Sequence, residues 1–277
     1  MGIAADTDMG IAADWDAALA ALAWQVEAGV DEVILDTPVN RYDLLVGAPR
    51  SDVSRTAPVA AAAAPVSPRQ EAAPLPATDA IQAAKAAATA ARTLDELRAA
   101  MAAFDHCEMK KGARNLVFAD GNPAARVLIL GEAPGPEEDR EGRPFVGKAG
   151  QLLDRMFAAI GLSRTSPEAE TALYITNVLP WRPPANRDPE PGEIAMMRPF
   201  VERHIALVAP AVIVVMGNTP LDALTGHRGI LKARGNWTTA LGKPLLPMTH
   251  PAYLLRNPAA KREAWADLLS LQARLRD

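Results

Sequence analysis

Short apolar runs alternate with helical patterns through much of residues 126–275, and this alternation most constrains the fold. Four runs have the composition of strands buried on both faces. They span residues 126–131, 173–178, 211–217 and 245–250. Helical patterns cover about 147–160, 191–208, 219–224 and 259–275. Strands that alternate with helices form a parallel sheet covered by helices, which predicts a three-layer α/β/α domain with a central four-stranded parallel sheet.

The chain upstream of this pattern has a different composition. Apolar residues within 15–28 fall at helical spacing, which predicts a short amphipathic helix in an N-terminal segment, 1–45. Residues 46–78 are rich in Pro, Ala and Ser and are predicted to form a linker, because they cannot bury enough apolar surface to offset their ordering entropy. We expect one helix over 81–104, with Thr93 as a candidate cap, leading into a domain at 79–277.

Charge is divided unevenly along the chain, whose net charge is −4. Residues 1–104 contain 7 Lys and Arg against 14 Asp and Glu, whereas residues 105–277 contain 22 against 19. Because binding to a polyanion depends on Lys and Arg facing phosphates, the C-terminal part is the expected nucleic-acid-binding region. The acidic N-terminal segment is a candidate docking segment for another protein.

Cysteine and histidine are too sparse for the common metal sites. Cys107 is the only cysteine and the four histidines are scattered, which excludes an internal disulfide and a Cys-rich metal site. The N-terminus lacks the basic and apolar regions of a signal peptide, and no apolar run approaches about 18 residues. We therefore expect a soluble, cytoplasmic monomer that makes no membrane contact.

Polar or Gly-rich residues follow each predicted strand. Ligands of such sheets bind beyond the carboxyl ends of the strands, which makes 131–135, Asn177, 217–218 and His250 the candidates. Glycines in the first loop let backbone amides approach a ligand, and Phe145 farther along it offers an aromatic face on which a base can stack. The alternative for this loop is a charged, solvated segment.

Two single side chains complete the candidate set. Asn177 offers both a donor and an acceptor, as reading one base edge requires, although a turn or helix cap is the usual role of a lone Asn. His250 precedes Pro251 and could donate a hydrogen bond to a carbonyl or a developing oxyanion, although a lone His is more often structural. These two assignments are therefore supported only when they are considered together with the other candidate residues.

Six ordered blocks resemble the family-four uracil-DNA glycosylases, and the match covers about residues 104–275. The blocks are GEAPG at 131–135, GRPFVG at 142–147, YITNV at 174–178, RPPANRDP at 182–189, RPF at 198–200 and HPAYLLR at 250–256. The resemblance implies a monofunctional enzyme of base excision repair. Such an enzyme flips uracil out of DNA and hydrolyses its N-glycosidic bond, leaving an abasic site.

The resemblance also implies a role for each candidate. Phe145 would stack on the flipped uracil, Asn177 would bind its pairing edge and His250 would stabilise negative charge on O2 as the bond breaks. Glu132 is the candidate for polarising or placing the attacking water. The loop residues Gly131, Ala133, Pro134 and Gly135 would hold a uracil oxygen and a water through their backbone.

Contacts to DNA are expected from two segments. Leu254 and Leu255 would supply a wedge into the gap left by the flipped base, and Arg256 a phosphate contact. Arg234, together with Arg228 and Lys232, forms a second basic segment that could bind phosphate, with a solvated charge run as the alternative.

The sequence departs from the family at the positions of an iron-sulfur cluster. Family-four enzymes generally hold this cluster with four cysteines, but here Cys107 stands alone. Lys110, Trp181 and Met197 occupy what correspond to the other three positions, and none of them can serve as a thiolate. We therefore predict that the protein has no cluster and no other metal or cofactor, with apolar packing of Trp181 and Met197 in the cluster's structural role.

Two other classes of protein compete with this interpretation. A non-catalytic DNA-binding module of the same fold would not need Phe145, Asn177 and His250 together. A nucleotide-binding α/β enzyme would need a phosphate-binding motif, but the chain has neither Gly-x-Gly-x-x-Gly nor Gly-Lys-Ser/Thr. If the chain is a repair enzyme, the partner of its acidic N-terminal segment would be a repair or replication protein.

Overall fold

The computed structural model describes residues 77–276. The predicted N-terminal helical segment, 1–45, lies outside the described residues. So does the predicted linker, 46–78, except for its last two residues, with which the first described helix begins.

A six-stranded sheet runs through the centre of the domain in the order β1-β3-β2-β4-β6-β5. Its strands are β1 (Asp120–Gly121), β2 (Val127–Gly131), β3 (Leu173–Asn177), β4 (Val212–Met216), β5 (Thr238–Ala240) and β6 (Lys243–Met248). The four inner strands pair in parallel, which confirms the predicted parallel sheet. The antiparallel edge strands β1 and β5 were not predicted, because two or three residues give no periodic signal.

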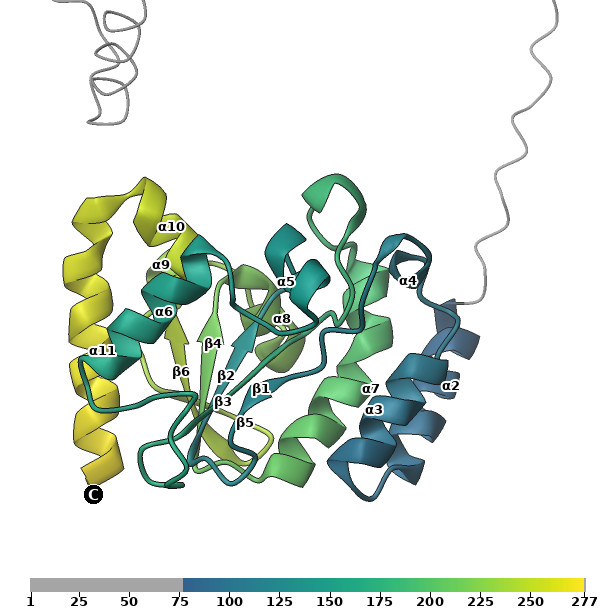
Figure 1. The fold of residues 1–277 in the computed structure, drawn as a ribbon, viewed down its shortest axis with the longest axis horizontal. Helices are drawn as coiled ribbons and strands as arrows, with labels where there is room; N and C mark the ends of the chain where they lie inside the picture. The colour runs from purple at the N-terminus through teal and green to yellow at the C-terminus, as the bar shows by residue number, and fades with distance from the viewer. Residues whose placement is uncertain (1–76, 277) are drawn as a thin grey trace, which may run out of the picture. The chain divides into compact units, whose positions relative to one another are not determined.

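Successive residues of the inner strands face opposite sides of the sheet and build two separate cores. In β2, Val127 and Ile129 join one apolar cluster with α6 (Lys148–Ala158) and α11 (Lys261–Arg276). Leu128 and Leu130 face the other cluster, which includes residues of α7 (Pro191–Val208). Figure 1 shows α6 and α11 to the left of the sheet and α7 to its right, which is the predicted three-layer arrangement.

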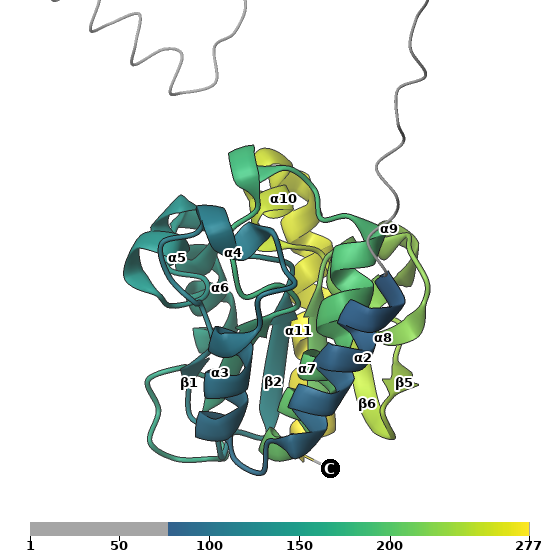
Figure 2. The same ribbon diagram turned by 90° about the vertical axis from the view of Figure 1, so that its right-hand side faces the viewer.

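Two helices replace the single helix predicted for 81–104. They are α2 (Ala77–Ala90) and α3 (Leu94–Ala103), and both pack against α7, in front of the sheet in Figure 2. The helical conformation is interrupted before Thr93, which is the N-cap of α3. Thr93 has an extended backbone, and its side chain accepts a hydrogen bond from the Glu96 amide at 3.1 Å. Thr93 is thus an N-cap in the middle of the predicted helix, and an N-cap starts a new helix.

Short helical segments follow the carboxyl ends of the parallel strands, most of them toward the top of Figure 1, while α8 runs back beside the sheet. They are α4 (Met109–Gly112), α5 (Pro136–Glu141), η2 (Pro184–Asn186), α8 (Asn218–Thr225), α9 (Ile230–Ala233), α10 (Pro251–Arg256) and η3 (Pro258–Ala260). No helix within residues 77–276 combines the length and apolar character needed to cross a membrane.

Candidate functional site

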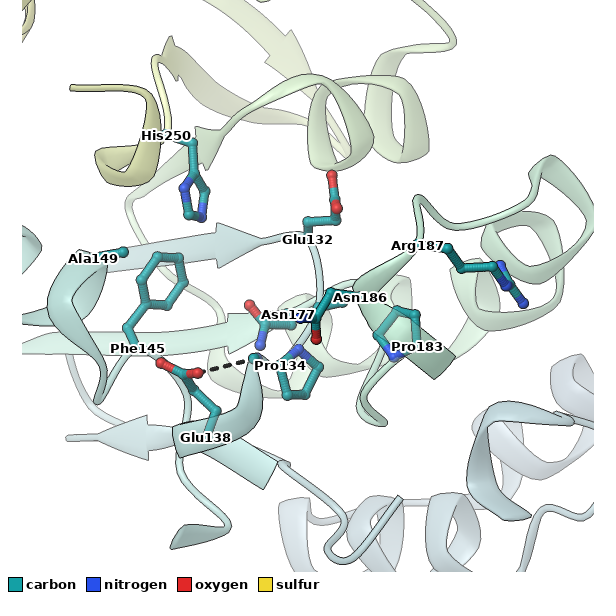
Figure 3. A pocket seen from close by; sticks show the side chains of 12 residues that line it. Glu132, Pro134, Glu138, Phe145, Ala149, Asn177, Pro183, Asn186, Arg187 and His250 are labelled. Atoms are coloured by element: carbon teal, nitrogen blue, oxygen red, sulfur yellow. Dashed lines mark hydrogen bonds between the residues drawn. The ribbon is translucent and has the colours of Figure 1, made fainter. Parts of the chain in front are cut away.

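A cavity of about 220 Å³ lies beyond the carboxyl ends of β2, β3 and β6 (Figure 3). It is lined by Glu132, Ala133, Pro134, Gly135, Glu138, Phe145, Ala149, Asn177, Pro183, Asn186, Arg187 and His250. Phe145, Asn177 and His250, more than 100 residues apart at the extremes, therefore share one cavity. We call it the base cavity.

Asn177 ends β3 in register with Gly131 at the end of β2. Its side chain is 5% exposed, and its Oδ1 has no hydrogen-bond partner among the described residues. A side chain at position 131 would not fit, because a Cβ there would lie 2.3 Å from Asn177 Oδ1 and 2.5 Å from Phe145 Cε2. Gly131 thus lets the amide and the ring approach each other, and a buried acceptor remains free to receive a hydrogen bond.

Phe145 adopts a left-handed backbone conformation, with φ of 54°, which costs free energy for a residue other than glycine. Two neighbours hold it there. Arg164 donates hydrogen bonds to the carbonyls of Pro144 at 2.8 Å and Phe145 at 2.9 Å, and its own charge is balanced by Asp120 and Asp154. On the other side the Phe145 carbonyl lies so close to Gly150 that a Cβ there would be 1.8 Å away.

Glu138 connects the two loops that form this wall of the base cavity. Its carboxylate accepts hydrogen bonds from the Gly135 amide at 3.0 Å and from the Val146 and Gly147 amides at 2.9 Å each. Sequence analysis missed this residue, because its partners are backbone amides up to nine residues away and leave no pattern of residue types.

His250 is the N-cap of α10, and its ring lies over that of Phe145, with centroids 5.4 Å apart and an interplanar angle of 30°. Burial lowers the pKa of His250 to about 4, and the positive charge of Arg256 adds to this effect. The imidazole is therefore neutral near pH 7. Its Nδ1 accepts a hydrogen bond from the Ala252 amide at 3.1 Å, so the proton of the neutral ring is on Nε2.

Glu132 separates the base cavity from a second cavity of about 490 Å³. Its carboxylate accepts a hydrogen bond from the Thr219 hydroxyl at 2.6 Å and points away from Phe145 and Asn177 in Figure 3. The second cavity also contains Arg228, Arg256 and Thr249, whose buried hydroxyl has no hydrogen-bond partner among the described residues.

The structure divides the residues predicted to contact DNA. Leu255 is 42% exposed and Arg256 lines the second cavity, but Leu254 is completely buried near Leu152 and Ala264. Leu254 therefore cannot act as a wedge, and the prediction for it was wrong. Consecutive residues of a helix point about 100° apart, so α10 directs one leucine inward and the other outward.

Arg234 also differs from its prediction. Its guanidinium is only 18% exposed and is paired with Asp267, which lies buried in α11, and with Glu263. Arg234 thus stabilises the packing of α11 and is not available as a phosphate contact.

Five cavity-lining residues were not predicted: Glu138, Ala149, Pro183, Asn186 and Arg187. Three of them lie in the RPPANRDP block, whose residue types alone indicate no role. In this block Arg187 forms a two-pronged ion pair with Glu193 of α7, which fixes the loop beside the cavity.

Three of the four positions that the resemblance assigns to cluster ligands are packed as protein core. Cys107, Trp181 and Met197 are at most 3% exposed and belong to one apolar cluster, while Lys110 pairs with Asp105. Burial raises the pKa of the Cys107 thiol, which disfavours the thiolate that binds metals. Within 77–276 no group of three His, Cys, Asp or Glu side chains could hold a metal ion. These residues do not fit a four-cysteine cluster.

Comparison with known proteins identifies the family of this chain. The model of the uracil DNA glycosylase superfamily matches residues 118–269. A type-4 uracil-DNA glycosylase of Thermotoga maritima is 41% identical over 154 residues, covering 54% of this chain and 77% of the relative. One from Archaeoglobus fulgidus is 33% identical over 186 residues, covering 63% and 89%. A type-5 uracil-DNA glycosylase of Thermus thermophilus is 34% identical over 123 residues, covering 41% and 55%.

Proposed function

This chain belongs to the uracil DNA glycosylase superfamily, and on that basis we propose that it is a monofunctional uracil-DNA glycosylase of base excision repair. It takes an extruded uracil into the base cavity and hydrolyses the N-glycosidic bond, releasing free uracil and leaving an abasic site. The observation that carries this proposal is the unpartnered, buried Oδ1 of Asn177 in the same cavity as the ring of Phe145.

Recognition follows from these two side chains. The pairing edge of uracil presents an N3–H donor next to the O4 acceptor, and Asn177 Oδ1 accepts a hydrogen bond from N3–H. Cytosine carries no hydrogen on N3, so it would leave the buried oxygen unpaired, which costs about 1–3 kcal/mol. Phe145 stacks on the base, and the backbone of Gly131, Ala133, Pro134 and Gly135 surrounds its edge.

His250 lowers the barrier to bond cleavage. When the N-glycosidic bond breaks, uracil leaves with the bonding electrons and negative charge develops on O2, while the sugar becomes cationic. The Nε2–H of the neutral imidazole donates a hydrogen bond to O2, where that charge appears. A neutral donor retains its proton, so uracil leaves as an anion that the hydrogen bond stabilises.

Glu132 is assigned to the water that attacks C1′ of the sugar. The location of its carboxylate, between the base cavity and the second cavity, supports this role, because the sugar of an extruded nucleotide would lie at that boundary. On the DNA side, Leu255 is the remaining candidate for the wedge, and Arg256 contacts a phosphate.

The proposed reaction uses no metal or cofactor. Uracil departure and water attack are served by Asn177, His250 and Glu132, and the core packing of Cys107, Trp181 and Met197 supports the absence of an iron-sulfur cluster. An absorption spectrum of the purified protein tests this point: no band in the visible region is expected, and a brown protein would contradict it.

Excision from an oligonucleotide with one uracil, read by alkaline cleavage of abasic sites on a gel, tests the function. We expect turnover with uracil, and none with an oligonucleotide that carries cytosine at the same position. No product at stoichiometric enzyme would favour the non-catalytic DNA-binding module. A panel of U:G, U:A, single-stranded U, hypoxanthine, xanthine and T:G substrates then defines the range.

We propose that the protein acts in the cytoplasm as a monomer on uracil-containing DNA, while its acidic N-terminal segment docks a repair or replication protein. A variant lacking residues 1–76 keeps α2 whole and should retain excision activity, whereas a large loss would contradict this division of roles. Size-exclusion chromatography of both forms tests the monomer.

A further inference from the structure

A third cavity is an open groove of about 480 Å³ whose lining includes residues next in the chain to those of the base cavity. Its lining residues are Gly112, Ala113, Arg114, Pro136, Asp139, Arg140 and Arg182. Pro136 follows the cavity residue Gly135, and Arg182 precedes the cavity residue Pro183, so two chain segments contribute residues to both linings. We call it the arginine groove.

The charge of the arginine groove is positive. Asp139 is its only acidic lining residue, and this carboxylate already accepts hydrogen bonds from the backbone amides of Arg114 and Asn115. Arg182 donates to the neutral Asn186 side chain, and Arg140 lies 3.8 Å from Glu141 with its side chain 62% exposed. Arg114 forms no ion pair with any described residue. The groove therefore presents three guanidinium groups that are mostly unneutralised.

Guanidinium groups lie near two different parts of the base-cavity lining. The second cavity, with Arg228 and Arg256, shares Glu132, Ala133 and His250 with the base cavity, whereas the arginine groove is lined by the chain neighbours of Gly135 and Pro183. A DNA strand that places one nucleotide in the base cavity must leave it in two directions. Guanidinium groups bind phosphate oxygens through paired hydrogen bonds, so such a strand would meet matching groups on both sides.

We propose that the arginine groove binds phosphates of the uracil-containing strand, on the side of the flipped nucleotide opposite to Arg256. This inference rests on the proposed function, since it takes the base cavity as the place of the flipped base. It adds Arg114, Arg140 and Arg182 as strand-binding residues. It also implies that substitutions can weaken the contacts to the DNA on one side of the uracil without affecting those on the other side.

The test compares two triple variants with the same loss of charge. In one, Arg114, Arg140 and Arg182 are replaced by Gln; in the control, Arg98, Arg155 and Arg276 are replaced by Gln. The control arginines are exposed on α3, α6 and α11, form no ion pair with any described residue and line none of the three cavities. Thermal unfolding of both variants verifies that they are folded.

Single-turnover excision is measured with single-stranded substrates that carry about ten nucleotides on both sides of the uracil, only 5′ to it, or only 3′ to it. With both flanks, the groove variant should need at least about tenfold more enzyme for half-maximal rate than the control, and its log–log dependence on salt should be shallower by about 2. Its rate at saturating enzyme should match the control. Its loss of affinity should persist with one single-flank substrate and disappear with the other. Equal behaviour of the two variants, or the same loss on both single-flank substrates, would overturn the proposal.

A binding measurement distinguishes this inference from the proposed function. Fluorescence anisotropy measures the affinity for a labelled single-stranded oligonucleotide that contains no uracil, so it tests DNA binding by the groove without catalysis. If the unmodified protein excises nothing, the proposed function fails. The groove proposal is then supported when the groove variant binds this oligonucleotide more weakly than the control, and is overturned when the two bind equally.

Discussion

The base cavity and the core around Cys107, Trp181 and Met197 differ in whether their buried polar atoms have hydrogen-bond partners. In the described residues, the two buried polar side-chain atoms without partners, Asn177 Oδ1 and Thr249 Oγ1, belong to residues that line the base cavity and the adjacent second cavity. The core is closed by comparison: its apolar side chains pack together, and its buried Tyr174 hydroxyl and His204 Nε2 bond each other at 2.8 Å. The comparison indicates that the cavity is built to receive a ligand, whereas the core needs none.

This difference predicts which changes affect stability and which affect catalysis. Changes in the core should lower the free energy of unfolding with little effect on excision per folded molecule. Changes in the cavity should lower excision per folded molecule with little effect on the free energy of unfolding. The reason is that the unmade hydrogen bond and the strained residue already destabilise the folded protein.

The largest expected effect is in the core. Met197 is fully buried in the apolar core, and Met197→Ala should lower the free energy of unfolding by about 2–5 kcal/mol. Met197→Leu keeps most of the volume and should cost less than about 1.5 kcal/mol. Urea unfolding measures both. A small effect of Met197→Ala would mean that the core around it is not tightly packed.

In the cavity, His250→Ala should lower single-turnover excision about 100-fold, since it removes the donor to the developing charge on O2. Asn177→Ala should lower it at least about tenfold, since it removes recognition of N3–H. Asn177→Ala should unfold at nearly the same urea concentration as the unmodified protein, whereas His250→Ala should also lose about 1 kcal/mol of stability, because it removes the N-cap of α10. A loss of stability large enough to account for the loss of activity would contradict the conclusion that cavity residues serve catalysis and core residues serve stability.

His204 gives the core a pH dependence. Burial lowers its pKa from 6.5 to about 3, so below pH 6.5 the unfolded chain takes up a proton that the folded protein does not. The contribution of His204 to the free energy of unfolding is therefore complete above pH 6.5 and falls as the pH is lowered, by about 3 kcal/mol near pH 4.5. Urea unfolding is measured above pH 6.5 and at pH 4.5. Between these pH values His204→Gln should lose less stability than the unmodified protein, by the amount that His204 contributes. Parallel pH profiles would contradict the assignment.

Arg164 does not line the base cavity but stabilises the strained backbone of Phe145, which does. Arg164→Lys keeps the charge but loses the paired hydrogen bonds to the Pro144 and Phe145 carbonyls, so Phe145 should be held less firmly. We expect excision at subsaturating enzyme to fall about tenfold, corresponding to about 1.4 kcal/mol. Arg126→Lys, which loses bonds to Glu170 and the Leu275 carbonyl away from the cavity, is the matched control and should stay within about twofold.

The smallest expected effect is at Cys107. Its thiol is buried and its pKa is raised, so it acts as a small apolar side chain and not as a ligand. Cys107→Ala should leave excision unchanged and lower the free energy of unfolding by at most about 1 kcal/mol. A loss of activity, or of a visible absorption band, would show that this region does more than pack.

Much of the fold could be predicted from local pattern. The four parallel strands have continuous apolar runs, and α7 follows its pattern from Pro191 to Val208, because burial on both faces of a sheet or on one face of a helix acts on residue type directly. The break at Thr93 and the short edge strands β1 and β5 escaped prediction, since a cap or a pair of residues carries too little signal. Two assignments failed for a different reason: the exposure of Leu254 and of Arg234 depends on how α10 and α11 pack, not on their own residues.

The sequence by itself determined the sheet, the polar residues at its carboxyl edge, the lack of three cysteine ligands and the set of Phe145, Asn177 and His250. Only the tertiary structure decided that Asn177 keeps a free acceptor, that Glu138 and Arg164 hold the Phe145 loop, and that Nε2 of a neutral His250 carries the proton. Residue types and strand ends are local properties, whereas unmet hydrogen bonds, backbone strain and lowered pKa values arise from atoms that the chain brings together across long separations.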